Sequence, residues 1–266
     1  MPAGLQPAWV LHRRSYGDGG FLVEMFTLDQ GRLSTVLRGA RRKARGGSAA
    51  GLAQPFTPLL IEIGGRGDLK MLRRIEAVSA GIALPGRALF SGLYINELLM
   101  RMLPRYDPQP GLFAQYGALL PGLADRDSDL AIRTLELALL DELGYGLRFD
   151  RDSQGADIDQ TAHYRFDPER GFTLSRFSHS EENAVVGAVI SGDLLAEIHC
   201  WLTTGQNLSE QSRRELKHIV RIALARHLGD KPLRSRALLR AFLAGKAAPT
   251  AALAEPVENI TDGVLK

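Results

Sequence analysis

The hydrophobic period of the chain changes at Gly81, and this change limits the folds open to it. Before Gly81, short apolar segments alternate with turn signals; after it, apolar residues recur every three or four positions. The first pattern is typical of strands and the second of amphipathic helices. The expected strands are Ala8–Arg14, Gly19–Thr27, Arg32–Leu37, Pro55–Ile63 and Asp68–Val78.

Five short strands within about 80 residues indicate a small closed β-barrel, because closure removes exposed sheet edges. An oligonucleotide-binding (OB) barrel is favoured at this size, although the strand pattern alone leaves an SH3-like barrel open.

The remainder of the chain is predicted to be mainly helical. The expected helices cover residues 89–103, 110–123, 129–143, 193–202, 209–228 and 235–243. Residues 146–180 are turn-rich, with one expected hairpin of Ala162–Phe166 and Gly171–Leu174. The fold class is therefore α+β. We expect an OB domain at 1–80, a helical domain at 81–245 with a small irregular insert at 146–180, and a disordered tail at 246–266.

Composition indicates a soluble, cytoplasmic protein. Hydrophobic residues make up 45% and charged residues 24% of the chain, which is ordinary for a globular protein. Met1–Trp9 lacks the charged and apolar regions of a signal peptide, and no apolar run approaches the roughly 18 residues of a membrane helix. The single cysteine, Cys200, allows neither an internal disulfide nor a thiolate zinc cage.

Positive charge is concentrated in two zones that flank an acidic middle. Residues 1–80 carry 12 Lys and Arg against 6 Asp and Glu, and residues 213–240 carry 9 against 2. Residues 81–212 carry 10 against 19. The densest basic run, 38–45, cannot enter a core, because buried unpaired guanidinium groups are too costly. It predicts a solvated loop that either binds an anionic partner or has no partner.

No residue pattern supports catalysis or metal binding. The acidic series that begins at Asp125 resembles a calcium loop but has Leu130 at the position that needs glycine. A second series from Asp150 ends on Thr161, which is a poor calcium ligand. The glycines at 64–67 lie between two strands, where a phosphate-binding loop is not expected. We therefore expect no enzyme activity, no metal and no cofactor.

Eight short segments, in order along the chain, resemble the RecO family of bacterial DNA repair proteins. They are Leu11–Gly17, Phe26–Thr27, Arg38–Arg41, Gln54–Leu59, Gly65–Gly67, Gly92–Leu99, Leu135–Leu140 and Lys231–Arg236. Each segment is short, but eight in register over residues 8–243 are specific.

This resemblance implies a recombination mediator without catalytic activity, acting in the RecFOR pathway at the nucleoid. Members bind single- and double-stranded DNA, anneal complementary strands and bind the C-terminal tail of single-strand-binding protein. They work with RecR, and in many bacteria RecF, to load RecA. Some members hold a four-cysteine zinc site in the region that corresponds to residues 146–180. This chain has no cysteine there, so packing must take the place of zinc.

The residues themselves suggest where DNA would bind. Phosphate contacts from the basic side of the barrel give affinity without sequence choice. The candidates are Arg14, Arg38, Arg41, Arg42, Lys43, Arg45, Arg73 and Arg74, with Arg13 as reinforcement. Tyr16 either stacks on a base or is a structural tyrosine of the core or rim.

The acidic tail of a partner requires an apolar pocket edged by cations. Arg133, Lys217 and Arg221 are the candidates, provided that helices 129–143 and 209–228 pack side by side. Two alternatives remain: Arg133 pairs with Asp129 or Glu136 on its own helix, and the basic face of helix 209–228 is simply solvated.

Two other functions remain open from the sequence. An OB-fold RNA-binding or translation factor would fit the charge layout but not the large helical region. A nuclease or phosphotransferase would need a metal-dependent activity for which we find no residues.

Overall fold

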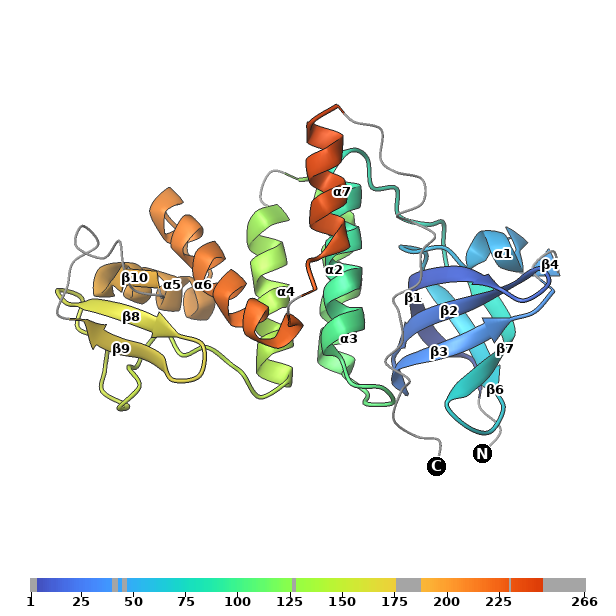
Figure 1. Cartoon of the computed structure of the whole chain (residues 1–266), viewed down its shortest axis with the longest axis horizontal. Helices are drawn as coiled ribbons and strands as arrows, with labels where there is room; N and C mark the ends of the chain where they lie inside the picture. Colours follow the sequence, from blue (N-terminus) through green and yellow to red (C-terminus); the bar gives the residue numbers. More distant parts are fainter. Residues whose placement is uncertain are drawn as a thin grey trace. The chain divides into compact units, whose positions relative to one another are not determined.

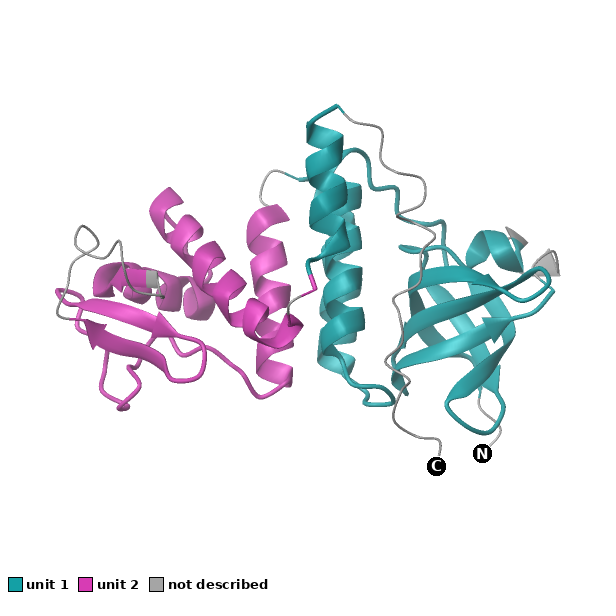
Figure 2. Cartoon of the chain, viewed as in Figure 1, with its two compact units in different colours: residues 1–125, 232–266 teal, residues 126–231 magenta. Residues whose placement is uncertain are grey.

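The computed structural model describes residues 4–39, 43–44, 47–125, 128–175, 188–229 and 231–245. The chain divides into two compact units, which Figure 2 shows in different colours. Unit 1 contains residues 1–125 and 232–266, and unit 2 contains residues 126–231. Among the described residues, no helix is both long and apolar enough to cross a membrane.

The N-terminal part of unit 1 is a closed barrel, which confirms the predicted five strands. These are β1 (Gln6–Tyr16), β2 (Gly20–Thr27), β3 (Gly31–Leu37), β6 (Leu59–Gly64) and β7 (Leu69–Ala77). Their order around the barrel is β1-β2-β3-β7-β6, and β6 pairs with β1 to close it (Figure 1). Only the β3–β7 pairing within the barrel is parallel. This strand order is that of the OB fold.

The connection between β3 and β6 contains short elements that the sequence did not predict. These are β4 (Lys43–Ala44), β5 (Gly47–Ser48) and the helix α1 (Ala49–Leu52). Ser48 caps α1, since its hydroxyl accepts a hydrogen bond from the Gly51 amide at 3.1 Å. Figure 1 shows α1 at one end of the barrel.

The barrel core consists of the inward-facing residues of all five strands. Val10, Val23, Met25, Leu33 and Ile61 are fully buried there. Because side chains alternate across a strand, the intervening residues face outward. Some of these are also apolar, and they bind the helices of unit 1.

Four helical segments complete the described part of unit 1. They are α2 (Arg87–Met102), α3 (Pro110–Leu119), the 3₁₀ helix η1 (Leu120–Ala124) and α7 (Arg234–Leu243). Trp9 and Phe26, on the outside of the barrel, form edge-to-face ring contacts with Tyr116 of α3 at 5.5 and 6.5 Å between centroids. α7 lies along α2, although it is far from α2 in sequence (Figure 1).

Two buried hydrogen bonds join α2 to the barrel and α3 to α2. The Asn96 side-chain amide donates to the Leu11 carbonyl at 3.0 Å, and the Tyr116 hydroxyl donates to the Asn96 side-chain oxygen at 2.7 Å. Burial raises the pKa of Tyr116 far above its usual value, while the hydrogen bond to Asn96 opposes this shift. The phenol is therefore neutral at physiological pH.

Unit 2 combines helices with a small sheet. Its helices are α4 (Ser128–Glu142), α5 (Gly192–Thr204) and α6 (Glu210–Leu228). Its strands β8 (His163–Asp167), β9 (Gly171–Ser175) and β10 (Ala188–Ser191) pair in the order β10-β8-β9. The β8–β9 hairpin agrees with the expected one, whereas β10 was not expected as a strand.

The segment at 146–180, which has no cysteine, is packed by aromatic rings. The centroid of Phe172 lies 5.5 Å from that of Phe149 and 5.1 Å from that of Phe166, and all three residues are buried. Nearby, Arg148 holds Asp150 through two hydrogen bonds of 3.0 and 2.8 Å and lowers the pKa of that carboxyl to about 2. Within the described residues, no cluster of His, Cys, Asp and Glu could hold a metal ion.

Candidate nucleic-acid interface

The outer face of the barrel away from α3 carries rows of side chains that the strand register aligns. Arg14 of β1 lies opposite Leu22 of β2, which lies opposite Val36 of β3, and Val36 lies opposite Met71 of β7. Leu22, Val36 and Met71 each neighbour an inward-facing core residue, so their side chains point outward, and Arg14 shares their row. The row places an arginine beside an apolar strip.

The next row toward the β1–β2 hairpin adds an aromatic ring and two cations. Tyr16 lies opposite Gly20 in the β1–β2 pair. Arg38 directly follows β3, whose last residue Leu37 pairs with Phe21 of β2, and Arg73 lies on the neighbouring strand β7. Both arginines are exposed. We call Arg14, Tyr16, Arg38 and Arg73 the basic face.

A β-bulge explains why two consecutive arginines occupy β7. The β6–β7 register shifts between Glu62 and Ile63, which leaves Arg73 as an extra residue on β7. The guanidinium of Arg73 crosses the backbone at Gly64, where a side chain would collide with it. Arg74 instead donates from its Nε to Glu76 at 2.6 Å, so its charge is neutralised locally.

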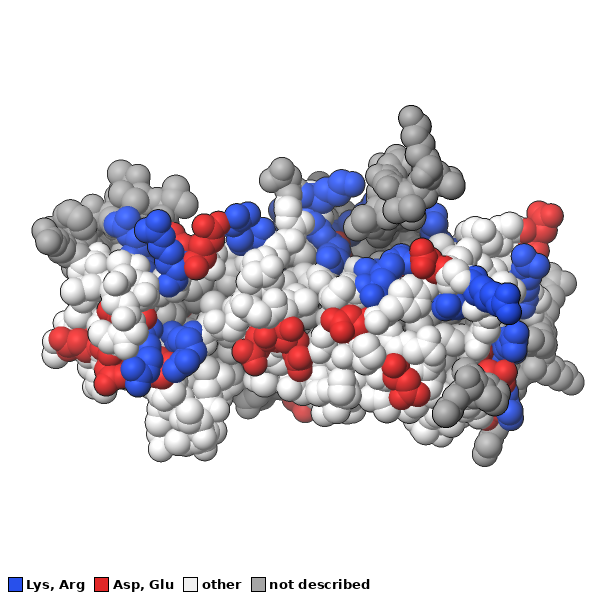
Figure 3. Space-filling model, turned by 90° about the horizontal axis from the view of Figure 1, so that it is seen from below, with Lys and Arg blue, Asp and Glu red and all other residues white. Residues whose placement is uncertain are grey.

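The densest part of the basic run lies outside the described residues. Arg41, Arg42 and Arg45 belong to that part, and Lys43 is described only through the backbone of β4. The run starts at Arg38, which is on the basic face. Figure 3 shows Lys and Arg side chains gathered over the barrel, at the right of the view.

Tyr16 lies at the surface and not in the core. It is 44% exposed and ends β1, just before the turn at Gly17. Gly17 and Gly19 have φ angles of 57° and 76°, a conformation that glycine adopts without strain. The ring is therefore accessible to a stacking partner.

Arg13, a neighbour of Arg14, has a structural role. Its side chain points toward the end of the barrel, where Nη1 donates to the Ala50 carbonyl of α1 at 2.7 Å. Its guanidinium also lies over the Phe21 ring, 4.8 Å from the centroid. These contacts tie α1 to the barrel.

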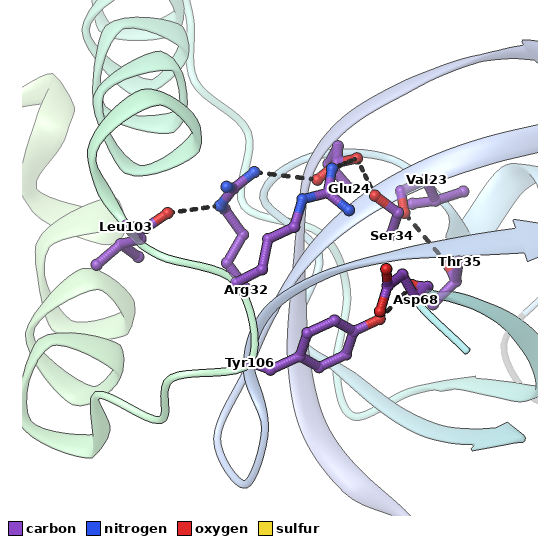
Figure 4. A network of polar contacts seen from close by, with 9 residues as sticks. Val23, Glu24, Arg32, Ser34, Thr35, Asp68, Leu103 and Tyr106 are labelled. Carbon is purple, nitrogen blue, oxygen red and sulfur yellow. Dashed lines mark hydrogen bonds and ion pairs between the residues drawn. The ribbon is translucent and has the colours of Figure 1, made fainter. Parts of the chain in front are cut away.

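A polar network on the outside of β2 and β3 involves two further arginines (Figure 4). Arg32 and Arg105 both contact the Glu24 carboxylate, at 3.4 and 3.3 Å. Arg32 Nε also donates to the Leu103 carbonyl at 2.9 Å, and Ser34 donates to Glu24. These bonds hold the segment after α2 against the barrel.

Tyr106 extends this contact to β7. Its amide donates to the Arg32 carbonyl at 2.9 Å and its hydroxyl donates to the Asp68 carbonyl. Lys70 lies over its ring, 5.5 Å from the centroid. This network could not be predicted from the sequence, because its residues are far apart in the chain.

The candidate residues for a partner tail have different environments in unit 2. α4 and α6 do pack against each other, and the Lys217 ammonium lies 3.2 Å from the Asp129 carboxylate across that contact. Arg221 is exposed. The Arg133 side chain is only 6% exposed and pairs with Glu136 at 2.6 Å, the alternative that the sequence left open. Arg133 therefore does not edge an open pocket in this structure.

A cleft of about 680 Å³ in unit 2 was not anticipated from the sequence. The Tyr145 ring stacks on the His227 ring at its edge, with centroids 3.8 Å apart. Two of its arginines are held by carboxylates: Arg226 donates to Glu169 at 2.6 Å, and Arg148 donates to Asp150. The Arg226–Glu169 pair connects the turn before β9 to α6.

Comparison with known proteins identifies the family. The family model described as "Recombination protein O N terminal" matches residues 1–80, and the one described as "Recombination protein O C terminal" matches residues 86–237. Together they cover more than half of the chain.

Relatives agree over nearly their whole length. The DNA repair protein RecO of Halorhodospira halophila is 40% identical over 238 residues, which is 89% of this chain and 97% of the relative. The proteins of the same name from Alkalilimnicola ehrlichii and Pseudomonas aeruginosa are each 42% identical, over 89% of this chain and 90% and 94% of their own lengths. The chain with this OB barrel and helical region therefore belongs to the RecO family of DNA repair and recombination proteins.

Proposed function

We propose that this protein is a non-catalytic recombination mediator that binds single-stranded DNA on the basic face of its barrel. The observation that carries the proposal is the register of the barrel strands, which places Arg14 and Tyr16 of β1 beside the hairpin end of β2 and the end of β3, which Arg38 follows. Cations would contact phosphates, and the exposed ring of Tyr16 would contact a base. Such binding has no sequence preference, which suits a protein that acts at any gap.

The further steps of the proposed function follow from the family. The protein would also bind double-stranded DNA, anneal complementary strands, bind the tail of single-strand-binding protein and help RecR, with or without RecF, to load RecA. The domain at 1–80 would supply the main DNA contacts, with Arg41, Arg42, Lys43 and Arg45 adding charge beside Arg38. The expected location is the cytoplasm, at the nucleoid.

For the partner tail, the exposed cations of α6 are the better supported part of the site. Arg221 is accessible, and Lys217 lies beside it on the same helix face, one turn away. A tail carboxylate that reached Arg133 would have to replace Glu136. We therefore propose that Arg221 and Lys217 make the first contacts with the tail.

The test of DNA binding is the double variant Arg14→Gln/Arg38→Gln. Neutralising about 4–5 phosphates gives a slope of log affinity against log salt near −3, and removing two contacts should make the slope shallower by about 1.4. Arg87→Gln/Arg170→Gln is the matched control, because it removes the same charge from exposed arginines outside the basic face. An unchanged slope in the first variant would place the DNA elsewhere.

The same titration separates the second candidate function, an RNA-binding factor. Matched DNA and RNA strands are compared with the wild-type protein. Tighter binding of the DNA, or equal binding, is consistent with the proposal, whereas clear preference for RNA would favour the translation or RNA-binding reading.

A further inference from the structure

The end of the barrel beside the basic face contains a pocket that the proposed function does not yet use. Its volume is about 540 Å³, and it is lined by Ser15, Gly17, Gly19, Gly20, Phe21, Ser48 and Ala50. The β1–β2 hairpin therefore forms one side and α1 with its cap the other. Clefts of this size accommodate a small organic group such as a nucleobase with its sugar.

The glycines of the hairpin keep this pocket open. A Cβ atom added at Gly17 or Gly19 would meet no atom within 4 Å, so side chains there would enter open space. At Gly20 a Cβ atom would come within 2.8 Å of the Tyr16 carbonyl oxygen, so only glycine fits. The hairpin consequently presents bare backbone to the pocket.

The pocket wall combines an aromatic surface with polar groups. Phe21 supplies the ring, and Arg13 fixes it through the contact at 4.8 Å while also holding α1 in place. Ser15 and Ser48 supply hydroxyl groups, and a hydroxyl can donate and accept at the same time. A flat aromatic surface with a few hydrogen-bonding groups suits an unstacked base.

The neighbourhood of the pocket determines the class of ligand. Tyr16, between pocket residues Ser15 and Gly17, is exposed, and Arg14 and Arg38 carry positive charge on the adjoining face. A phosphodiester backbone that crosses the basic face would thus pass the rim of the pocket. A free apolar ligand would not need these cations.

We propose that this pocket accepts one unpaired nucleobase of a strand bound on the basic face. This inference rests on the proposed function and deepens it, because it gives the protein a means to distinguish single strands from duplex. In a duplex the bases are stacked and paired, so none can enter without an unpairing cost.

The test compares two short single strands, an oligothymidylate and an abasic strand with the same number of phosphates. The wild-type protein should bind the thymidylate about 5- to 150-fold more tightly, the range for stacking of one base. Ala50→Phe, which fills the pocket from α1, should lower thymidylate affinity toward that of the abasic strand and leave only the preference that stacking on Tyr16 contributes. It should leave binding of the abasic strand and of a blunt duplex unchanged.

Two further variants keep the test decisive. Ala50→Ser adds almost no volume, so its thymidylate affinity should equal that of wild type. Ala50→Leu fills the pocket only partly, so its thymidylate affinity should lie between those of wild type and Ala50→Phe. It takes the place of Ala50→Phe if that variant does not fold. The proposal that the pocket accepts a base would be overturned if the wild-type protein bound both strands equally well. It would also be overturned if the filled variants folded and kept the full thymidylate affinity of wild type. Either result would leave the proposed DNA binding intact. Failure of the wild-type protein to bind either strand would overturn the proposed function itself.

Discussion

The buried hydrogen bonds of Asn96, which join α2 to the barrel and to α3, give a sharp test of the fold. Tyr116→Phe removes one hydroxyl from a buried ring and leaves the Asn96 side-chain oxygen without its donor. The ring contact with Trp9 is kept, so no cavity forms. An unsatisfied buried acceptor costs about 1–3 kcal/mol, and we expect unit 1 to lose that much stability.

Trp9 provides the assay. The chain has two tryptophans, Trp9 and Trp201, so Trp201→Phe leaves Trp9 as the single reporter in unit 1. Its ring centroid lies 5.5 Å from that of Tyr116, which places it at the bond under test. Urea unfolding followed by its fluorescence gives the change in free energy of unfolding.

A surface tyrosine serves as the control. Tyr16→Phe removes a hydroxyl from a residue that is 44% exposed and should change stability by less than about 0.5 kcal/mol. If Tyr116→Phe unfolded at the same urea concentration as its parent, the hydrogen bond to Asn96 would not stabilise unit 1 as we expect.

The pH dependence of the same bond has a definite sign. Burial raises the folded-state pKa of Tyr116, and the hydrogen bond to Asn96 only partly opposes it. An unfolded tyrosine ionises near pH 10. The stability due to the neutral phenol is therefore complete below about pH 10 and lost as pH rises above it, and Tyr116→Phe should show a smaller alkaline loss.

Three further expectations concern other parts of the chain. Gly31→Ala should destabilise unit 1 by at least about 1–2 kcal/mol in thermal unfolding, because its φ is 65° and a Cβ atom would collide with the Asp107 carbonyl; a melting temperature equal to wild type would contradict this. Arg221→Ala should weaken a fluorescent tail peptide by about 1.5–3 kcal/mol without lowering stability, whereas Arg133→Ala should cost about 3–5 kcal/mol of stability because it breaks a buried ion pair; a peptide affinity within twofold of wild type for Arg221→Ala would place the tail site elsewhere. Chelators should leave the melting temperature unchanged and metal analysis should find less than one zinc per chain, since a structural zinc is coupled to folding; tightly held stoichiometric zinc would overturn this expectation.

The barrel could be predicted because its strands follow a local rule. Residues such as Val23, Met25 and Leu33 alternate with outward-facing residues in segments that are bounded by turns, so the strand positions could be predicted. The rule does not predict the positions of Trp9 and Phe26, since these residues are apolar but face outward to α3. A period of two shows which residues share a face, and it does not show what covers that face.

The candidate site depends on contacts that no local pattern contains. The placement of Arg38 and Arg73 on neighbouring strands follows from the parallel pairing of β3 with β7, which are far apart in the sequence. Similarly, Arg133 is charged and one residue from the apolar stripe of its helix, and its burial depends on tertiary packing. The sequence identified basic residues in the right part of the chain, and the structure decided which of the described ones lie together.

We propose that this protein brings complementary strands together as a mediator of recombination. The most direct measurement is the rate of annealing of two complementary strands that are precoated with single-strand-binding protein, with and without this protein. We expect annealing to be faster in its presence and the acceleration to be lost with Arg14→Gln/Arg38→Gln but kept with Arg87→Gln/Arg170→Gln. An annealing rate that is the same with and without the wild-type protein would contradict the account.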